Sequence, residues 1–386
     1  MRRQPQPLPF AAYLAWVTGL CLLGSLASSY LAYSHYRVHT DIGYQSFCAL
    51  SKAINCDTVS QSPYAVFGPL PLAVWGLAGY WIFLLLLFFA ALPSARPRRI
   101  WSLCLMIAIS FSAVSIALAV ISHRLIGSYC FLCLLTYAVN LLLVFSCWIV
   151  RRRFDTAPLR SAIADDLQFL WGHWRRSLPS FATMFAIVTA AILVYPTYWN
   201  LVLPDPSSSI PAGINAEGHP WIGAEQPTIE IVEFTDYQCF QCRKMHFFLR
   251  ELVRLNPERI RLTHRNYPID HEYNPIVKEP FHVGSGKMAL LAIHASLAGK
   301  FWAVNDWLFS RTLSGEDLNL AELALDAGLT PRELQAALQH EPYVQRLLLD
   351  IRQGMLLRIA GTPSYLINGQ VYEGNIPSDV LQTLIN

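Results

Sequence analysis

Two Cys-x-x-Cys motifs are the residues of this chain best suited to chemistry. Cys239 and Cys242 lie in the polar C-terminal half, and Cys130 and Cys133 lie at the start of an apolar segment. A thiolate attacks a disulfide through a mixed-disulfide intermediate, and a second cysteine nearby resolves that intermediate. Cys239 and Cys242 are therefore predicted to be a redox-active dithiol, which makes this a protein that exchanges disulfide bonds.

The residues around Cys239 predict that it begins a helix. Residues 228–234 alternate apolar and polar side chains and are rich in β-branched types, which predicts a strand. Helix-favouring residues follow the motif at 243–253. The positive end of a helix dipole stabilises a thiolate, so Cys239 is the predicted nucleophile and Cys242 the resolving cysteine.

Zinc binding is the structural alternative for this motif. The C-terminal domain has no other cysteine to complete a zinc site. His246 could add a ligand, but a solvated helix histidine is the more ordinary explanation. We therefore predict no metal. The remaining histidines of this domain's core segments show no metal-ligand spacing and are expected to be structural or at the surface: His264, His271, His282 and His294.

The composition predicts a membrane protein. Of the 386 residues, 54% are hydrophobic and only 14% are charged, against about 25% charged in ordinary globular chains. The net charge of +3 is too small to indicate nucleic-acid binding. A membrane-spanning helix needs roughly 20 apolar residues. Five stretches meet this requirement, at 8–33, 69–92, 100–121, 130–150 and 181–203.

Basic residues predict the orientation of these spans, because short loops rich in Lys and Arg stay in the cytoplasm. The loops on one side hold three basic residues, Arg37, Lys52 and Arg124, whereas the segments on the other side hold eleven. The N-terminus is one of the segments on the richer side and is therefore expected in the cytoplasm. Five spans then place the C-terminal domain outside, on the same side as the loop with Cys48 and Cys56. A cleaved signal peptide is the alternative for the first span. The cytoplasmic segments hold Arg2, Arg3, Arg96, Arg98, Arg99, Arg151, Arg152, Arg153, Arg160, Arg175 and Arg176.

The C-terminal domain resembles DsbA-like members of the thioredoxin family over residues 220–386. A second strand is predicted at 259–265, and a helical region at 286–359 precedes Gly361-Thr362-Pro363 and a final strand pair. Thr362-Pro363 resembles the cis-proline loop of this family. The resemblance implies that Thr362 and Pro363 lie against the active site and dock extended substrate chains.

Residues 8–150 resemble the vitamin K epoxide reductase family. The matching residues are Cys48, the segment 56–59, the segment 62–68, Trp75 and the segment 130–137. The expected fold is a four-helix membrane bundle with a fifth linking transmembrane helix, followed by an α/β thioredoxin-like domain with a helical insertion. The domains are expected at 8–150, at 151–203 for a cytoplasmic loop and the fifth span, at 204–219 for a periplasmic linker, and at 220–386.

The resemblance implies a relay of electrons through three cysteine pairs. Reduced Cys239 attacks a Cys48–Cys56 disulfide, Cys56 attacks Cys130, and Cys133 passes the electron pair to a quinone, either ubiquinone or menaquinone. Ser62 and Tyr137 match positions that line the family's quinone pocket, with a turn residue and an interfacial aromatic as their alternatives. Asp57 is a candidate for handling protons, with a surface carboxylate as the more ordinary interpretation. Cys21, Cys104 and Cys147 are expected to be buried apolar side chains.

The predicted function is a thiol oxidase of the bacterial inner membrane that forms disulfide bonds in secreted or periplasmic proteins and reduces the membrane quinone pool. One alternative is a reductase or isomerase that runs the relay in reverse, because reduction potentials are not readable from sequence. A second is reduction of a quinone epoxide. A third is a non-enzymatic membrane protein whose outer cysteines are structural disulfides.

Overall fold

The computed structural model of the chain describes residues 9–41, 44, 46–49, 54–95, 100–154, 157–199, 210–311 and 318–385. These residues divide into two units, one formed by 1–38 with 45–198 and the other by 39–44 with 199–386. Some of the basic residues that predict the orientation lie outside the described residues: Arg2, Arg3, Lys52, Arg96, Arg98 and Arg99.

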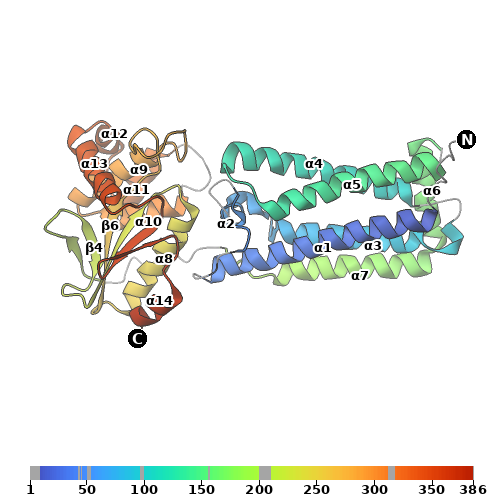
Figure 1. The fold of residues 1–386 in the computed structure, drawn as a ribbon, viewed down its shortest axis with the longest axis horizontal. Helices are drawn as coiled ribbons and strands as arrows, with labels where there is room; N and C mark the ends of the chain where they lie inside the picture. The colour runs from blue at the N-terminus through green and yellow to red at the C-terminus, as the bar shows by residue number, and fades with distance from the viewer. Residues whose placement is uncertain are drawn as a thin grey trace, which may run out of the picture. The chain divides into compact units, whose positions relative to one another are not determined.

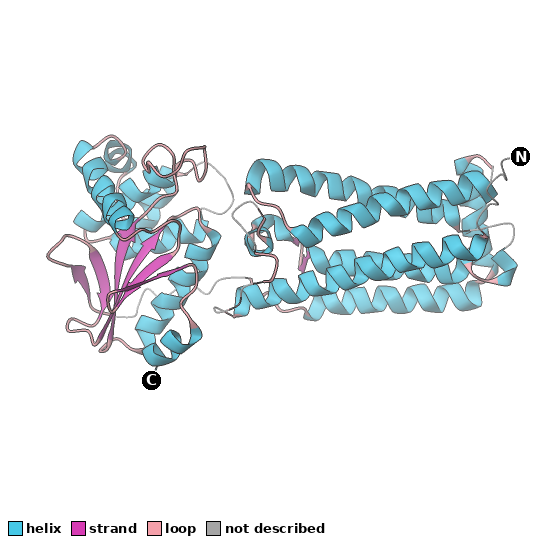
Figure 2. Cartoon of the chain, viewed as in Figure 1, coloured by secondary structure: helices cyan, strands magenta, loops and turns pink. Residues whose placement is uncertain are grey.

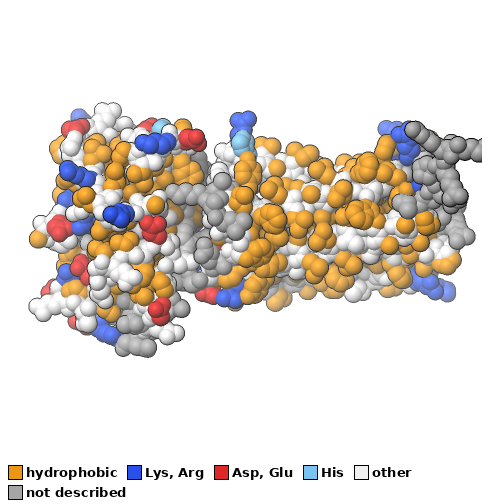
Figure 3. All heavy atoms as spheres, viewed as in Figure 1, with side chains coloured by type: hydrophobic (Ala, Val, Ile, Leu, Met, Phe, Trp, Pro, Cys, Tyr) orange, Lys and Arg blue, Asp and Glu red, His pale blue; other side chains and the backbone are white. Residues whose placement is uncertain are grey.

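Each of the five predicted spans is found as a helix long and apolar enough to cross a membrane. The helices form a bundle in Figure 1, and Figure 3 shows apolar side chains over most of its visible face. At most 33% of the most apolar window of each helix is buried inside the protein, as expected of helices with side chains that face lipid. The five are α1 (Phe10–Thr40), α3 (Leu72–Ala90), α4 (Trp101–Ile121) with its π-helical extension (Ser122–Ile126), α5 (Phe131–Phe154) and α7 (Trp174–Val194).

The fifth span differs from its predicted position at 181–203. Helix α7 begins at Trp174 and ends at Val194. Tyr195 has an extended backbone because the proline that follows it, Pro196, disfavours the helical conformation in the preceding residue. Apolar composition alone did not reveal this stop signal.

Helix α6 (Leu159–Gly172) lies in the segment that was expected to be a loop. Its buried Asp166 accepts backbone N–H bonds from Ile100, Ser102 and Leu103 at 2.6, 3.0 and 3.2 Å. These donors belong to the first turn of α4, which has no earlier carbonyls to bond. A carboxylate at this end also complements the helix dipole, so α6 caps α4 from outside it.

Short elements join α1 to α3 and carry Cys56. Asn55 caps α2 by accepting N–H bonds from Asp57 and Thr58, and its own N–H donates to the carbonyl of Tyr129 at 2.9 Å. This bond ties the segment before Cys56 to the segment before α5. The short elements are α2 (Cys56–Gln61), the 3₁₀ turns Pro63–Ala65 and Pro93–Ala95, and the strand pair β1 (Val66–Phe67) and β2 (Leu70–Pro71).

The second unit is built on a six-stranded sheet with the order β3-β4-β6-β5-β7-β8. Strands β5 and β6 are parallel and the other neighbours are antiparallel. Strand β3 lies in the segment expected to be a linker, where it pairs with β4 and extends the sheet. The strands are β3 (Ala212–Ile214), β4 (Pro220–Gly223), β5 (Ile229–Thr235), β6 (Ile260–Asn266), β7 (Ser364–Ile367) and β8 (Gln370–Glu373).

Helices cover both faces of this sheet (Figure 2). Alternation along β5 sends Ile231 into a core with α8 and α14, and Phe234 into a core with the inserted helices. This arrangement confirms the predicted α/β domain with a helical insertion. The helices are α8 (Phe240–Leu255), α9 (Ser285–Leu297), α10 (Phe301–Arg311), α11 (Leu320–Ala327), α12 (Pro331–Ala337), α13 (Glu341–Leu356) and α14 (Ser378–Ile385).

Candidate active site

Cys239 occupies the N-cap of α8, directly after the turn that follows β5. Its sulfur accepts the N–H of Cys242 at 3.2 Å, which is the hydrogen bond that a thiolate at a helix N-terminus would receive. Cys239 is 8% exposed and Cys242 is 1% exposed. The first sulfur is therefore the one that an incoming disulfide would meet.

The predicted proline loop lies against this cysteine. The Thr362–Pro363 peptide bond is cis, and the carbonyl oxygen of Thr362 is 3.5 Å from the Cys239 sulfur. Strand β7 begins directly after Pro363 and pairs antiparallel with β5. Because β5 also leads into the Cys239 turn, the sheet holds the two loops together.

The pKa values of the two thiols are shifted in opposite directions. Burial would raise the pKa of Cys239, but the hydrogen bond with the Cys242 thiol and the nearby His282 together lower the pKa overall. Burial raises the pKa of Cys242 well above its ordinary value, and the neighbouring Cys239 raises it further. Negative charge therefore collects on Cys239, as its predicted role as nucleophile requires.

Asp236 anchors His282 beside the Cys239 turn. Its buried carboxylate accepts the N–H groups of Gln238 and Ile269 at 2.7 and 2.6 Å, and the Ser285 hydroxyl at 2.9 Å. Nδ1 of His282 forms an ion pair with the same carboxylate at 3.1 Å. The sequence prediction of a purely structural or surface role for His282 missed this placement.

A second buried network joins β5 and β6 to α8 and α10. Glu233 of β5 contacts Nδ1 of His264 at 2.8 Å and Nδ1 of His246 at 3.9 Å. His246 contacts Asp306 at 2.6 Å, and Asp306 pairs with Arg250 at 3.0 Å. The prediction that His246 is a solvated helix histidine is wrong, because α8 turns this residue toward the inserted helices, where it is fully buried.

The first unit brings together the other four cysteines of the predicted relay. Cys48 is disulfide-bonded to Cys56, and Cys130 to Cys133. Three of the four pack with Leu132 in one buried cluster, and the half-buried Cys133 packs against it. Around this cluster, Asp57 accepts the N–H of Ser46 at 3.0 Å, so it holds the two cysteine-bearing segments together. Cys21, Cys104 and Cys147 are buried elsewhere in the bundle core, as expected.

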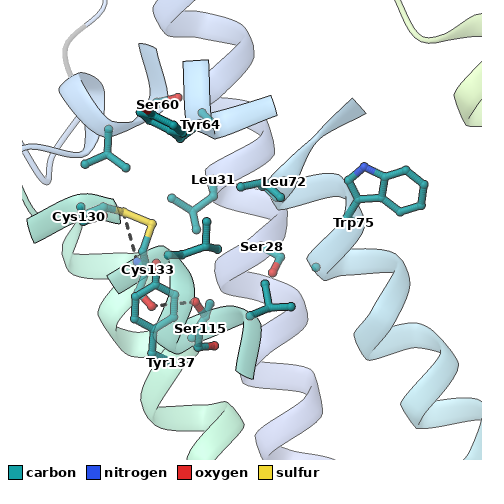
Figure 4. A pocket seen from close by; sticks show the side chains of 18 of the residues that line it. Ser28, Leu31, Ser60, Tyr64, Leu72, Trp75, Ser115, Cys130, Cys133 and Tyr137 are labelled. Carbon is teal, nitrogen blue, oxygen red and sulfur yellow. Dashed lines mark hydrogen bonds between the residues drawn. A yellow bond between two sulfur atoms is a disulfide. The ribbon is translucent and has the colours of Figure 1, made fainter. Parts of the chain in front are cut away.

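A cavity of about 300 Å³ opens beside the two disulfides. Figure 4 shows the Cys130–Cys133 disulfide at one side of this cavity, with Tyr137 one turn further along α5. Ser62 also lines the cavity, although its hydroxyl donates to the carbonyl of Val59 at 2.7 Å. The cavity thus brings both predicted quinone-pocket residues into the neighbourhood of the cysteine cluster.

Polar groups follow one wall of the cavity away from the cysteines. The Tyr80 hydroxyl donates to the side-chain oxygen of Asn140 at 2.8 Å, and the Asn140 amide donates to the Ser115 hydroxyl at 2.9 Å. All three residues line the cavity. Their mutual bonds satisfy polar groups that would be costly to bury alone. Within the described ranges, no group of three or more His, Cys, Asp or Glu side chains is arranged to hold a metal ion.

Models of two protein families match two separate parts of the chain. Residues 15–148 match the model of the vitamin K epoxide reductase family, and residues 215–386 match a thioredoxin model. No curated protein matches the chain.

The chain is similar to several solved structures over its C-terminal part. A thioredoxin-like oxidoreductase from Silicibacter pomeroyi is 25% identical, with 44% of this chain and 91% of that chain covered and a TM-score of 0.35. A periplasmic thioredoxin-like protein from Salmonella enterica serovar Typhimurium is 23% identical, with 44% and 90% covered and a TM-score of 0.36. Oxidised BdbD from Bacillus subtilis is 19% identical, with 45% and 96% covered and a TM-score of 0.36.

The cysteine geometry and the two family matches lead to one identification. The chain joins a region that matches the vitamin K epoxide reductase family to a region that matches a thioredoxin family, and together these matches support a disulfide oxidoreductase.

Proposed function

We propose that this protein is a membrane thiol oxidase that forms disulfide bonds in exported proteins and passes the electrons to a quinone. The observation that carries the proposal is the buried cluster of two disulfides beside a cavity lined mostly by apolar side chains. A disulfide pair in such surroundings needs an electron partner that dissolves in lipid. Quinones dissolve in lipid and accept two electrons, the number that one dithiol releases.

The proposed relay begins with the thioredoxin-like domain. A substrate dithiol becomes a disulfide and leaves Cys239 and Cys242 as thiols. The Cys239 thiolate then attacks Cys48, the Cys48–Cys56 bond breaks, and Cys56 leaves as a thiolate. Cys242 attacks Cys239 and restores their disulfide, so two electrons have moved to the Cys48 pair. Cys56 next attacks Cys130 in the same way.

The last pair in the proposed relay is Cys130 and Cys133. As these two thiols return to a disulfide, two electrons and two protons leave for the quinone, which acts as the terminal oxidant. The cavity fits such a molecule because its lining is mainly apolar and includes a few polar side chains next to the Cys130–Cys133 disulfide. Ser62 and Tyr137 are the side chains that we propose to hydrogen-bond the quinone oxygens.

The cellular setting of the proposed relay is the bacterial inner membrane, with the thioredoxin-like domain on the periplasmic side. Five spans and a cytoplasmic N-terminus would place the Cys239 domain and the Cys48 loop in the same oxidising compartment. Reduced secreted or periplasmic proteins are the proposed substrates. We propose that Thr362 and Pro363 dock them, which the 3.5 Å approach of the Thr362 carbonyl to Cys239 supports.

Quinol formation by the purified full-length protein tests this function. A reduced, unfolded substrate is mixed with the protein and with ubiquinone or menaquinone in turn. We expect quinol from the parent, none from Cys239→Ala or Cys133→Ala, and parental rates from the matched control Cys147→Ala, whose cysteine is outside the three pairs. A Cys242→Ala variant should accumulate a mixed disulfide between Cys239 and Cys48. Equal quinol formation by the parent, the two relay variants and the control would rule out the relay.

A second mixture, in which the protein meets quinol and a disulfide-bonded substrate, decides the direction of electron flow. If the protein instead oxidises quinol and reduces a disulfide-bonded substrate at a higher rate, the reductase or isomerase alternative is correct. Supplying a quinone epoxide in place of the quinone tests the remaining enzymatic alternative.

A further inference from the structure

The cavity contains a histidine, His35, that has no part in the relay described above. Ser28, Leu31 and His35 line the cavity from one face of α1, as residues three to four positions apart on a helix do. Leu31 packs against the four-cysteine cluster, and His35 lies one turn beyond it. His35 is buried. Of the described residues that line the cavity, it is the one Asp, Glu, His, Lys or Arg.

The segment just after the fifth helix holds this histidine. Nδ1 of His35 is 2.8 Å from the hydroxyl of Tyr198, and the two rings meet edge to face. The Tyr198 ring also meets the ring of Tyr36 edge to face, at 5.1 Å. The hydroxyls of Tyr198 and Tyr195 are 3.5 Å apart, and both residues are half-buried. A pair of half-buried tyrosines just after α7 therefore lies beside the buried imidazole.

Reduction of a quinone consumes protons as well as electrons. Two S–H bonds break, one S–S bond forms between Cys130 and Cys133, and two O–H bonds form on the quinone. A phenol such as Tyr137 ordinarily keeps its proton to about pH 10, whereas an imidazolium releases its proton near neutral pH. The cavity therefore needs an acid that exchanges protons near neutrality, and His35 is of the right type.

We propose that His35 delivers a proton to a quinone oxygen while Cys130 and Cys133 form their disulfide, and that the Tyr198 hydroxyl stabilises the charged ring by accepting a hydrogen bond from Nδ1–H. Nε2 is the ring atom that delivers the proton, because Nδ1 is bonded to Tyr198. One thiol proton passes to the other quinone oxygen and the second thiol proton restores the charge at Nε2, so the two protons gained by the quinone balance the two lost by the dithiol. This inference rests on the proposed function.

Several titratable groups surround the imidazole and would share in its response to pH. Tyr198 packs on its ring from the segment after α7, and Tyr36 packs on Tyr198 from α1. Cys56 and Tyr64, from the segments around α2, and Cys130 and Cys133, from the start of α5, line the same cavity. Unlike these tyrosines and cysteines, a histidine ordinarily gains its charge between about pH 5 and 8.

A single-turnover experiment tests the role of His35. Full-length protein with Cys130 and Cys133 reduced is mixed with decylubiquinone from about pH 5.5 to about pH 8.5, a range that brackets an ordinary histidine. The loss of the two thiols is followed by maleimide tagging. We expect the parental rate to fall as the pH rises through the histidine range. His35→Gln should be about 10²-fold slower near pH 6, as is typical for a lost general acid, and should lack the pH dependence.

Quinone binding provides the second readout. The affinity of the oxidised protein for decylubiquinone, measured by tryptophan fluorescence, should stay within about threefold of the parent in His35→Gln, a difference below about 0.7 kcal/mol. The matched control is His123→Gln. His123 also lies 2.8 Å from a tyrosine hydroxyl, that of Tyr129, but it is exposed and does not line the cavity. This control should keep the parental rate and pH profile.

Three results would overturn the inference. The first is a His35→Gln variant with the parental rate and pH profile, which leaves the proposed function intact. The second is a loss of quinone affinity that accounts for the whole loss of rate, which makes His35 a binding residue. The third is a parent that does not oxidise Cys130 and Cys133 with quinone, which removes the proposed function as well.

A second variant carries the test if His35→Gln fails to fold. Tyr198→Phe keeps the ring contacts and removes the hydroxyl. A charged imidazolium loses more than a neutral ring when its hydrogen-bond partner is removed. We therefore expect thiol oxidation to slow several-fold at neutral pH and less at acidic pH. A Tyr198→Phe variant with parental rates across the whole range would contradict the inference.

Discussion

Asp236 offers a quantitative test of how the Cys239 turn is held. Substitution by asparagine keeps the shape of the side chain but leaves one acceptor oxygen in place of two. In the parent, Oδ1 accepts the N–H of Gln238, while Oδ2 accepts the N–H of Ile269 and the hydroxyl of Ser285 and pairs with His282. The side-chain amide of the Asp236→Asn variant cannot serve both sets of donors, so whichever way it is turned at least one buried N–H loses its partner.

The cost can be estimated from these contacts. One buried, unsatisfied N–H costs about 1–3 kcal/mol, and removing one partner of a buried ion pair costs about 3–5 kcal/mol. These terms overlap, because His282 can release its proton when Asp236 is neutralised. We therefore expect Asp236→Asn to lower the free energy of unfolding of the thioredoxin-like unit by about 3–5 kcal/mol at neutral pH.

The destabilisation should itself depend on pH. Burial alone would raise the pKa of Asp236, but His282 and the backbone N–H donors lower it overall. Its stabilising contribution is therefore present above about pH 4, the ordinary value for a free carboxyl, and is lost as the pH falls through the folded-state value. Burial alone would lower the pKa of His282, but Asp236 raises it overall. That contribution is present below about pH 6.5 and is lost as the pH rises through the folded-state value.

Amide hydrogen exchange of the full-length protein measures this change. The slowest amides of β5 and α8 report the free energy of global opening of the unit. Glu258→Gln is the control, because its exposed carboxylate should change that free energy by less than about 0.5 kcal/mol. A loss of less than about 1 kcal/mol in Asp236→Asn would show that the carboxylate does not support the turn.

Three further substitutions test other parts of the molecule. His282→Gln should slow iodoacetamide alkylation of Cys239 at mildly acidic pH, because the nearby cation that favours its thiolate is lost, and parental rates over the whole pH range would contradict this. Asp166→Ala should lower the melting temperature of the membrane unit, since three N–H groups lose a charged acceptor at about 1–3 kcal/mol each, and an unchanged melting curve would exclude the cap. Gly24→Ala should reduce quinone affinity, because the added methyl would overlap the Tyr80 ring that lines the cavity, whereas an unchanged affinity would mean that the wall yields freely.

Much of this architecture could be predicted because its signals are local in sequence. A membrane span is a continuous apolar stretch, so all five helices are found where composition placed them, apart from the shifted ends of the fifth and the end of the first, which continues past 33 to Thr40. A strand followed by Cys-x-x-Cys and a helix is equally local, and Cys239 is the helix cap as expected. The Thr362–Pro363 loop was predicted through its resemblance to a known loop, and it lies beside Cys239 although 123 residues separate the two.

The residues that sequence reasoning missed depend on tertiary placement. His246 reads as an ordinary helix residue, but α8 packs it against Glu233 and Asp306. His35 follows an apolar stretch and carries no motif, and only the packing of α1 against the cysteine cluster and of Tyr198 against its ring gives it a place in the cavity. Helix α6 was missed for the same reason, because its role as a cap becomes visible only once Asp166 is seen against α4.

The composition of the Cys239 motif explains why the inserted helices matter to its chemistry. The two residues between the cysteines, Phe240 and Gln241, carry no charge, and the Gln241 side chain bonds to Asn375. Any cation that favours the Cys239 thiolate must therefore come from another part of the fold. His282 supplies it from the loop before α9. The same Asp236 carboxylate that fixes His282 also binds the first residue of α9 and the loop after β6, so the electrostatics of the nucleophile are tied to the folding of the insertion. Loosening that insertion should weaken Cys239 as a nucleophile even where no residue of the motif has changed.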